Sequence, residues 1–114
     1  MAVMQPSALR LIRVEYPSTN PKRSFDVTPE TQTAHVGDVV RWQFVLHRHV
    51  AGPEWTIYFR KGSPTDDKEK NDTKSPNHIE IEPKKPGDYK YGVRLKDAHH
   101  NTVGDDDPRL IVIG

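Results

Sequence analysis

The sequence predicts an all-β fold, a Greek-key β-sandwich of about seven to eight strands. Three observations support this prediction: apolar residues recur with a period of two, turn-forming residues separate these segments at strand-like spacing, and the 3.6-residue period of an amphipathic helix is nearly absent. We therefore expect antiparallel sheets packed face to face, with one face of each strand in the core.

The strands are expected in order along the chain. RLIRVEY (10–16) comes first, since Ile12, Val14 and Tyr16 would share one face of an extended segment. The other strongly alternating segments are DVVRWQFVL (38–46), EWTIYFR (54–60), HIEIE (78–82), DYKYGVRLK (88–96) and RLIVI (109–113). Two weaker pieces, SFDVT (24–28) and QTAHV (32–36), complete the set. The expected core residues of the middle strands are Val40, Trp42, Phe44, Leu46, Trp55, Ile57, Phe59, Ile79, Ile81, Tyr89, Tyr91, Val93 and Leu95.

The chain of 114 residues fits one domain, which we place at 1–114. One long segment, KGSPTDDKEKNDTKSPN (61–77), interrupts the strand pattern. It is dense in Lys, Asp, Ser and Pro and holds no apolar residue to anchor it, which is typical of a mobile surface loop.

Charge and composition exclude several partners. With 17 Lys and Arg against 16 Asp and Glu, the chain lacks the concentrated positive potential that drives nucleic-acid binding. The start of the sequence has no apolar segment of signal-peptide length, and no run of about 18 apolar residues occurs. We therefore expect no nucleic-acid partner, no membrane partner and a cytoplasmic location, although a mature exported form lacking its signal would look similar.

Two motifs resemble those of a known family. HVGDVVRWQF (35–44) is similar to the G-D-x-V-x-W-x-N segment of cupredoxins, the small blue-copper β-sandwiches, and PGDYKYGV (86–93) is similar to their P-G-x-Y-x-Y-x-C segment. The second motif also resembles a segment of Ig-like and PKD-type sandwiches. The resemblance covers about Ala34 to Ile113 and implies a cupredoxin-like sandwich.

The same resemblance assigns the positions of the copper ligands, which in cupredoxins are two imidazoles, a thiolate and usually a thioether. Trp55 stands at the first His and Val93 at the thiolate, while Lys96 stands at the second His and Asn101 near the axial Met. A blue-copper centre cannot form without the thiolate, and the chain contains no Cys. We expect no cofactor, and we expect Trp55 and Val93 to fill the vacated end with apolar volume.

Histidines provide a second candidate site. His47 and His49 precede one loop, and His99 and His100 lie in another; the cupredoxin-like template places both loops at one end of the sandwich. Converging neutral imidazoles could bind zinc, copper(II) or nickel. The spacing leaves open whether they meet or are exposed residues at the loop rims. These four histidines and Trp55 are the candidate binding residues.

The leading interpretation is a metal-free, non-catalytic binding or assembly module. Its partner would be a protein or a second copy of the chain, bound through a sheet edge or an exposed sheet face. The side chains expected on exposed faces are Arg41, Gln43, Val45, Thr56, Tyr58 and Arg60. The alternative is a His-cluster protein for metal sequestration or sensing. A small hydrolase that uses a His with Asp97 is the remote possibility, because the sequence contains no hydrolase motif.

Overall fold

The computed structural model describes residues 8–59, 62–65, 72–105 and 108–114, except for the side chains of residues 72 and 73. Its regular structure consists of ten β-strands, and the described residues contain no helix. The prediction of an all-β chain is confirmed, whereas the expected number of strands was too low. None of the described segments forms a helix long and apolar enough to cross a membrane.

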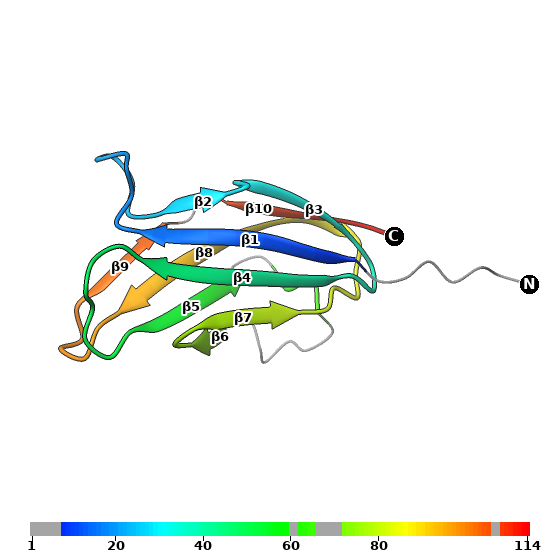
Figure 1. Cartoon of the computed structure of the whole chain (residues 1–114). Helices are drawn as coiled ribbons and strands as arrows, with labels where there is room; N and C mark the ends of the chain where they lie inside the picture. Colours follow the sequence, from blue (N-terminus) through cyan, green and yellow to red (C-terminus); the bar gives the residue numbers. More distant parts are fainter. Residues whose placement is uncertain (1–7, 60–61, 66–71, 106–107) are drawn as a thin grey trace, which may run out of the picture.

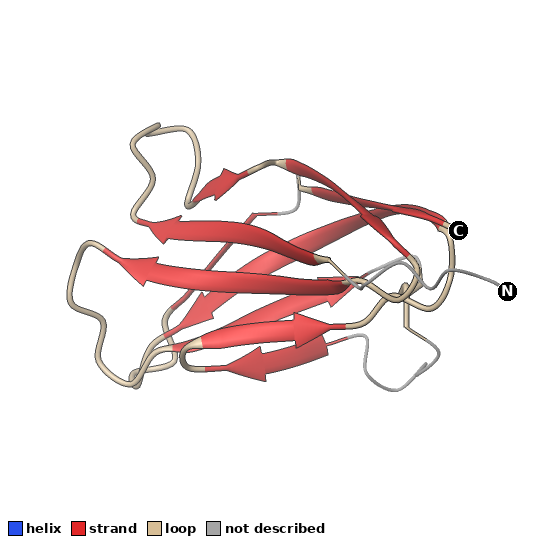
Figure 2. Ribbon diagram, turned by 45° about the vertical axis from the view of Figure 1, so that its right-hand side comes forward, coloured by secondary structure: helices blue, strands red, loops and turns tan. Residues whose placement is uncertain are grey.

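The strands form two sheets that lie face to face (Figures 1 and 2). The first sheet has the order β2-β1-β4-β7, with β2 at Asp26–Thr28, β1 at Leu9–Tyr16, β4 at Val39–Leu46 and β7 at His78–Ile81. The second sheet has the order β3-β10-β8-β5-β6, with β3 at Thr31–His35, β10 at Arg109–Ile113, β8 at Gly87–Lys96, β5 at Glu54–Phe59 and β6 at Asp72–Ser75. The remaining strand, β9 (Thr102–Asp105), pairs with residues 93–96 of β8.

Both sheets are mixed, which corrects the expectation of antiparallel sheets. β1 runs parallel to β4 along its whole length, and β10 runs parallel to β3. The reason lies in the path of the chain: after β1 and β2 it crosses to the other sheet as β3, and it then returns to the first sheet as β4. Alternation along a strand does not report this crossing, because the period of two is the same in parallel and antiparallel sheets.

Two strands that the sequence did not predict, β6 and β9, are short and mostly polar. β6 has the sequence DTKS and lies inside the segment 61–77 that was predicted to be a loop, and β9 has the sequence TVGD. A second part of that segment is anchored, since Pro64 is fully buried and its carbonyl oxygen accepts hydrogen bonds from the Lys84 and Lys85 amides. Residues 66–71 lie outside the described part of the chain.

The core lies between the sheets and follows the predicted alternation. Every residue expected to face inward belongs to the apolar cluster, either fully buried like Trp42, Trp55 and Val93 or partly buried like Phe44 and Leu46. The aromatic rings form two groups in the core. Trp42 contacts the rings of Tyr91 and Phe59 in one group, and Trp55 contacts those of Phe25 and Phe44 in the other. Each aromatic side chain buries a large area, so both groups help to hold the two sheets together.

One expected surface is buried. Thr56 and Tyr58 are only 4% and 7% exposed, although both point away from the core on β5. The Tyr58 ring lies over the Cα of Gly92, its partner on β8, and the Arg94 guanidinium lies 4.6 Å from the ring centre. A glycine on β8 therefore creates the room in which Tyr58 packs. Arg60, predicted for the same face, lies outside the described residues.

Asp38 links three strands at the crossing between the sheets. Its carboxylate accepts hydrogen bonds from the backbone amides of Ala8 (3.0 Å) and His35 (2.9 Å), and from Arg10 Nε (3.0 Å). The hydrogen bonds from the His35 and Ala8 amides are the main reason that the pKa of Asp38 is lowered to about 2. The carboxylate joins the end of β3 to the start of β1 and β4.

We expect Asp38→Asn to destabilise the fold by about 2–3 kcal/mol at pH 7, because it weakens hydrogen bonds to a charged, buried acceptor. The folded-state pKa lies below the ordinary value of 3.8, so the carboxylate stabilises the protein above about pH 4 and this contribution is lost as the pH falls towards 2. Urea unfolding at several pH values should show the difference between wild type and variant narrowing over that range. A difference independent of pH would contradict this role of the charge.

Gly92→Ala should also destabilise the protein, by about 1–3 kcal/mol, through overpacking. A Cβ at this position would lie 2.0 Å from Tyr58 Cζ. In a Tyr58→Ala background the same substitution should be better tolerated, because the obstructing ring is gone. Chemical unfolding of the two single variants and the double variant measures this coupling, and strictly additive effects would show that the ring is not the obstacle.

Candidate functional site

The two loops that carry the conspicuous histidines lie at the same end of the sandwich (Figure 1). The β4–β5 loop spans residues 47–53 and the β8–β9 loop spans residues 97–101. They touch directly, because the Ala98 amide donates a hydrogen bond to the Ala51 carbonyl oxygen at 2.8 Å. A Cβ built on Gly52 would lie 3.1 Å from Ala98 Cβ, so the approach is close.

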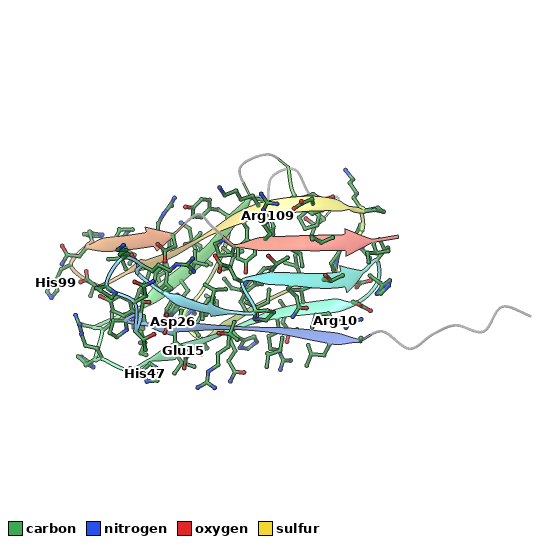
Figure 3. The ribbon with its side chains drawn as sticks, turned by 90° about the horizontal axis from the view of Figure 1, so that it is seen from above. Arg10, Glu15, Asp26, His47, His99 and Arg109 are labelled. Carbon is green, nitrogen blue, oxygen red and sulfur yellow. The ribbon has the colours of Figure 1, made fainter. Side chains whose placement is uncertain are left out.

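The histidines themselves are not gathered into one metal site. His47 Nε2 lies 3.1 Å from Glu15 Oε1 on β1, while His99 lies at the tip of the β8–β9 loop (Figure 3). His47, His49, His99 and His100 are all exposed. Within the described ranges, no group of three or more His, Asp or Glu side chains is arranged to hold a metal ion.

The β8–β9 loop has a structural explanation of its own. Asp97 accepts hydrogen bonds from the amides of His99 and Asn101 and from Asn101 Nδ2, and the Asn101 amide is the largest cause that lowers the pKa of Asp97. His100 adopts a left-handed backbone conformation with φ of 66°. Asn101, near the position that the resemblance gives to the axial ligand, therefore shapes a tight turn.

The other three positions that the resemblance assigns to copper ligands are occupied mainly by side chains of the core. Trp55 is 1% exposed, and its ring stacks on Phe44 with centroids 4.4 Å apart and planes 6° apart. The Trp55 ring also contacts the Phe25 ring, with centroids 5.4 Å apart. Val93 is fully buried, opposite Ile57 on β5, whereas Lys96 is partly exposed. The expected apolar filling by Trp55 and Val93 is present.

A groove of about 500 Å³ lies beside this aromatic stack. Its residues come from β4, from the start of β5 and from the turn between β6 and β7; they are Arg41, Gln43, Phe44, Leu46, Pro53, Trp55, Pro76, Asn77 and His78. Its surface is about equally apolar and polar. Binding sites combine apolar walls with polar groups that orient the ligand.

The polar side of the groove is cationic or neutral. Arg41 forms an ion pair with Glu80, its partner across β4 and β7, and this pair fixes the guanidinium at the groove rim. His78 and Asn77 follow Pro76 in the turn, and Gln43 lies opposite His78. The residues that line the groove include no carboxylate, and the Arg41 charge is balanced by that of Glu80, so the groove is suited to ligands that are apolar or neutral.

Sequence reasoning singled out Trp55 but missed the rest of the groove as a site. Pro53, Pro76 and Asn77 are common turn residues, and nothing in their spacing indicates that two distant turns approach one strand. Phe44 and Leu46 were assigned to the core, which is only part of their role. A scan of protein-family models and a search of curated proteins found no match to this chain.

Because no group of three or more ligating side chains is arranged to hold a metal ion in the described part of the chain, we expect zinc, nickel and copper(II) to bind only weakly. Isothermal titration of the wild type and of a His99→Ala, His100→Ala double variant should give equally weak binding heats, since the variant removes no such group. Added copper should give no intense thiolate band in the visible spectrum. Tight, stoichiometric binding that the double variant loses would establish a histidine site.

Proposed function

We propose that this chain is a non-catalytic, metal-free binding module of cupredoxin-like architecture whose ligand site is the groove beside Phe44 and Trp55. The groove is the observation that carries the proposal, because it is a concave surface that combines apolar contact area with polar groups. The partner would be another protein, or a second copy of the chain.

The filled end of the sandwich supports the absence of copper from this function. Trp55 and Val93 are packed into the apolar cluster. Replacing either side chain with a smaller one to admit a metal would leave a cavity in the core. The groove lies next to this filled end and opens along the edge of β4 rather than between the histidine loops.

A histidine-based metal site and a hydrolase are the other hypotheses. Among the described residues, histidines lie near carboxylates in three places: His47 pairs with Glu15, His35 Nδ1 lies 3.8 Å from Asp38, and His99 follows Asp97 in the β8–β9 loop. All three lie outside the groove, and the carboxylates of Asp38 and Asp97 already accept hydrogen bonds from backbone amides. A binding role therefore has the stronger support.

A fragment screen by NMR tests the proposal. Small apolar and aromatic fragments should shift the amide signals of Phe44, Leu46, Asn77 and His78 in the wild type. Leu46→Lys should abolish these shifts, because it places a charge on the apolar wall. Val45→Lys is the matched control, since the Val45 side chain is not among those that line the groove and its substitution should leave binding unchanged.

Thermal unfolding of both variants would show that each is folded. Shifts that are scattered over the surface, or that survive in Leu46→Lys, would rule out the groove as the ligand site.

A further inference from the structure

We infer that the occupant of the groove is an extended peptide segment of another protein, which adds as a strand to the open edge of β4; this inference rests on the function proposed above. We define the open edge as residues 44–46, on the side of β4 that faces away from β1. β7 pairs with residues 40–43 and stops there, so no described strand covers β4 beyond Gln43 on this side.

The backbone of the open edge is oriented for pairing. The Val39 amide donates to Ala8 O and the His47 amide donates to Tyr16 O, so the odd-numbered residues of β4 direct their amides towards β1. Backbone groups alternate in direction along a strand, and the N–H and C=O groups of Phe44 and Leu46 therefore point to the open side. Two donors and two acceptors are presented in line with the existing ladder to β7.

The groove follows this edge. Its lining residues include Arg41 and Gln43 from one face of β4 and Phe44 and Leu46 from the other, so the hollow wraps around the strand edge rather than lying on one face. A ligand in the groove is thus in contact with the unpaired backbone as well as with the side chains.

These two features together select an extended peptide. Main-chain groups of an added strand match the spacing of the four backbone groups, and its alternate side chains can enter the apolar space between Phe44, Leu46 and Pro76. The open edge is about 10 Å long at a rise of about 3.3 Å per residue, so recognition involves only a short segment. No carboxylate lines the groove and the Arg41 charge is balanced by Glu80, which favours a neutral segment.

The test uses phage-displayed random linear decapeptides, selected on the full chain and counter-selected on Leu46→Lys. Selected peptides should have apolar residues at alternate positions. Methylation of the backbone nitrogen at one set of alternate positions should weaken binding at least about tenfold, because those amides donate to β4, while methylation of the intervening amides has a smaller effect. Bound peptide should also slow hydrogen exchange of the Phe44 and Leu46 amides.

N-methylation leaves the protein unchanged, so this readout does not depend on the folding of any variant. If peptides bind but no N-methylation position matters, the strand-addition inference is wrong while the groove remains a binding site. If fragments bind and no peptide does, the inference fails and the proposed function stands. If neither binds, both fail. A concentration-dependent dimer that Leu46→Lys abolishes in sedimentation velocity would assign the groove to a second copy and overturn the choice of partner.

Discussion

The buried carboxylate of Asp38 is the constraint on which the arrangement of the first sheet depends. It ties the amide before β1 to the amide at the end of β3, at the point where the chain crosses between the sheets. The hydrogen bond from Val39 to Ala8 continues this link as the parallel ladder of β1 and β4, which ends where His47 donates to Tyr16. One side of β4 is therefore fully occupied, and any further pairing must use the other side.

The alternation in the sequence was sufficient to predict an all-β chain and its core. Ile12, Trp42 and Trp55 are buried because large apolar residues at every second position can leave water only on one face of a strand. The partners of each strand were not predictable, because parallel pairing of β1 with β4 depends on a crossing between distant segments. β6 and β9 were missed for a related reason: their stability comes from backbone pairing with β5 and β8, and their side chains are mostly polar.

The candidate site was predicted only in part. The resemblance directed attention to Trp55, which lines the groove, but the histidines that first suggest chemistry lie on loop surfaces, and His47 is paired with Glu15. The groove arises from proximity in space: Pro53 and Pro76 close two separate turns near one strand. The sequence alone indicates that each proline lies in a turn, but it does not indicate that the two turns approach the same strand edge.

The aromatic stack explains why a groove at this edge can bind without rearrangement. Phe44 is held against Trp55, which is itself held by Phe25, so the apolar wall is fixed before a ligand arrives. A fixed wall lowers the conformational entropy lost on binding, because its side chains are already held in place before the ligand binds. Trp55 closes the interior at the start of β5, so the accessible contact surface lies outside the core, along the edge of β4. The same side chain thus belongs to the core and supports the wall of the groove.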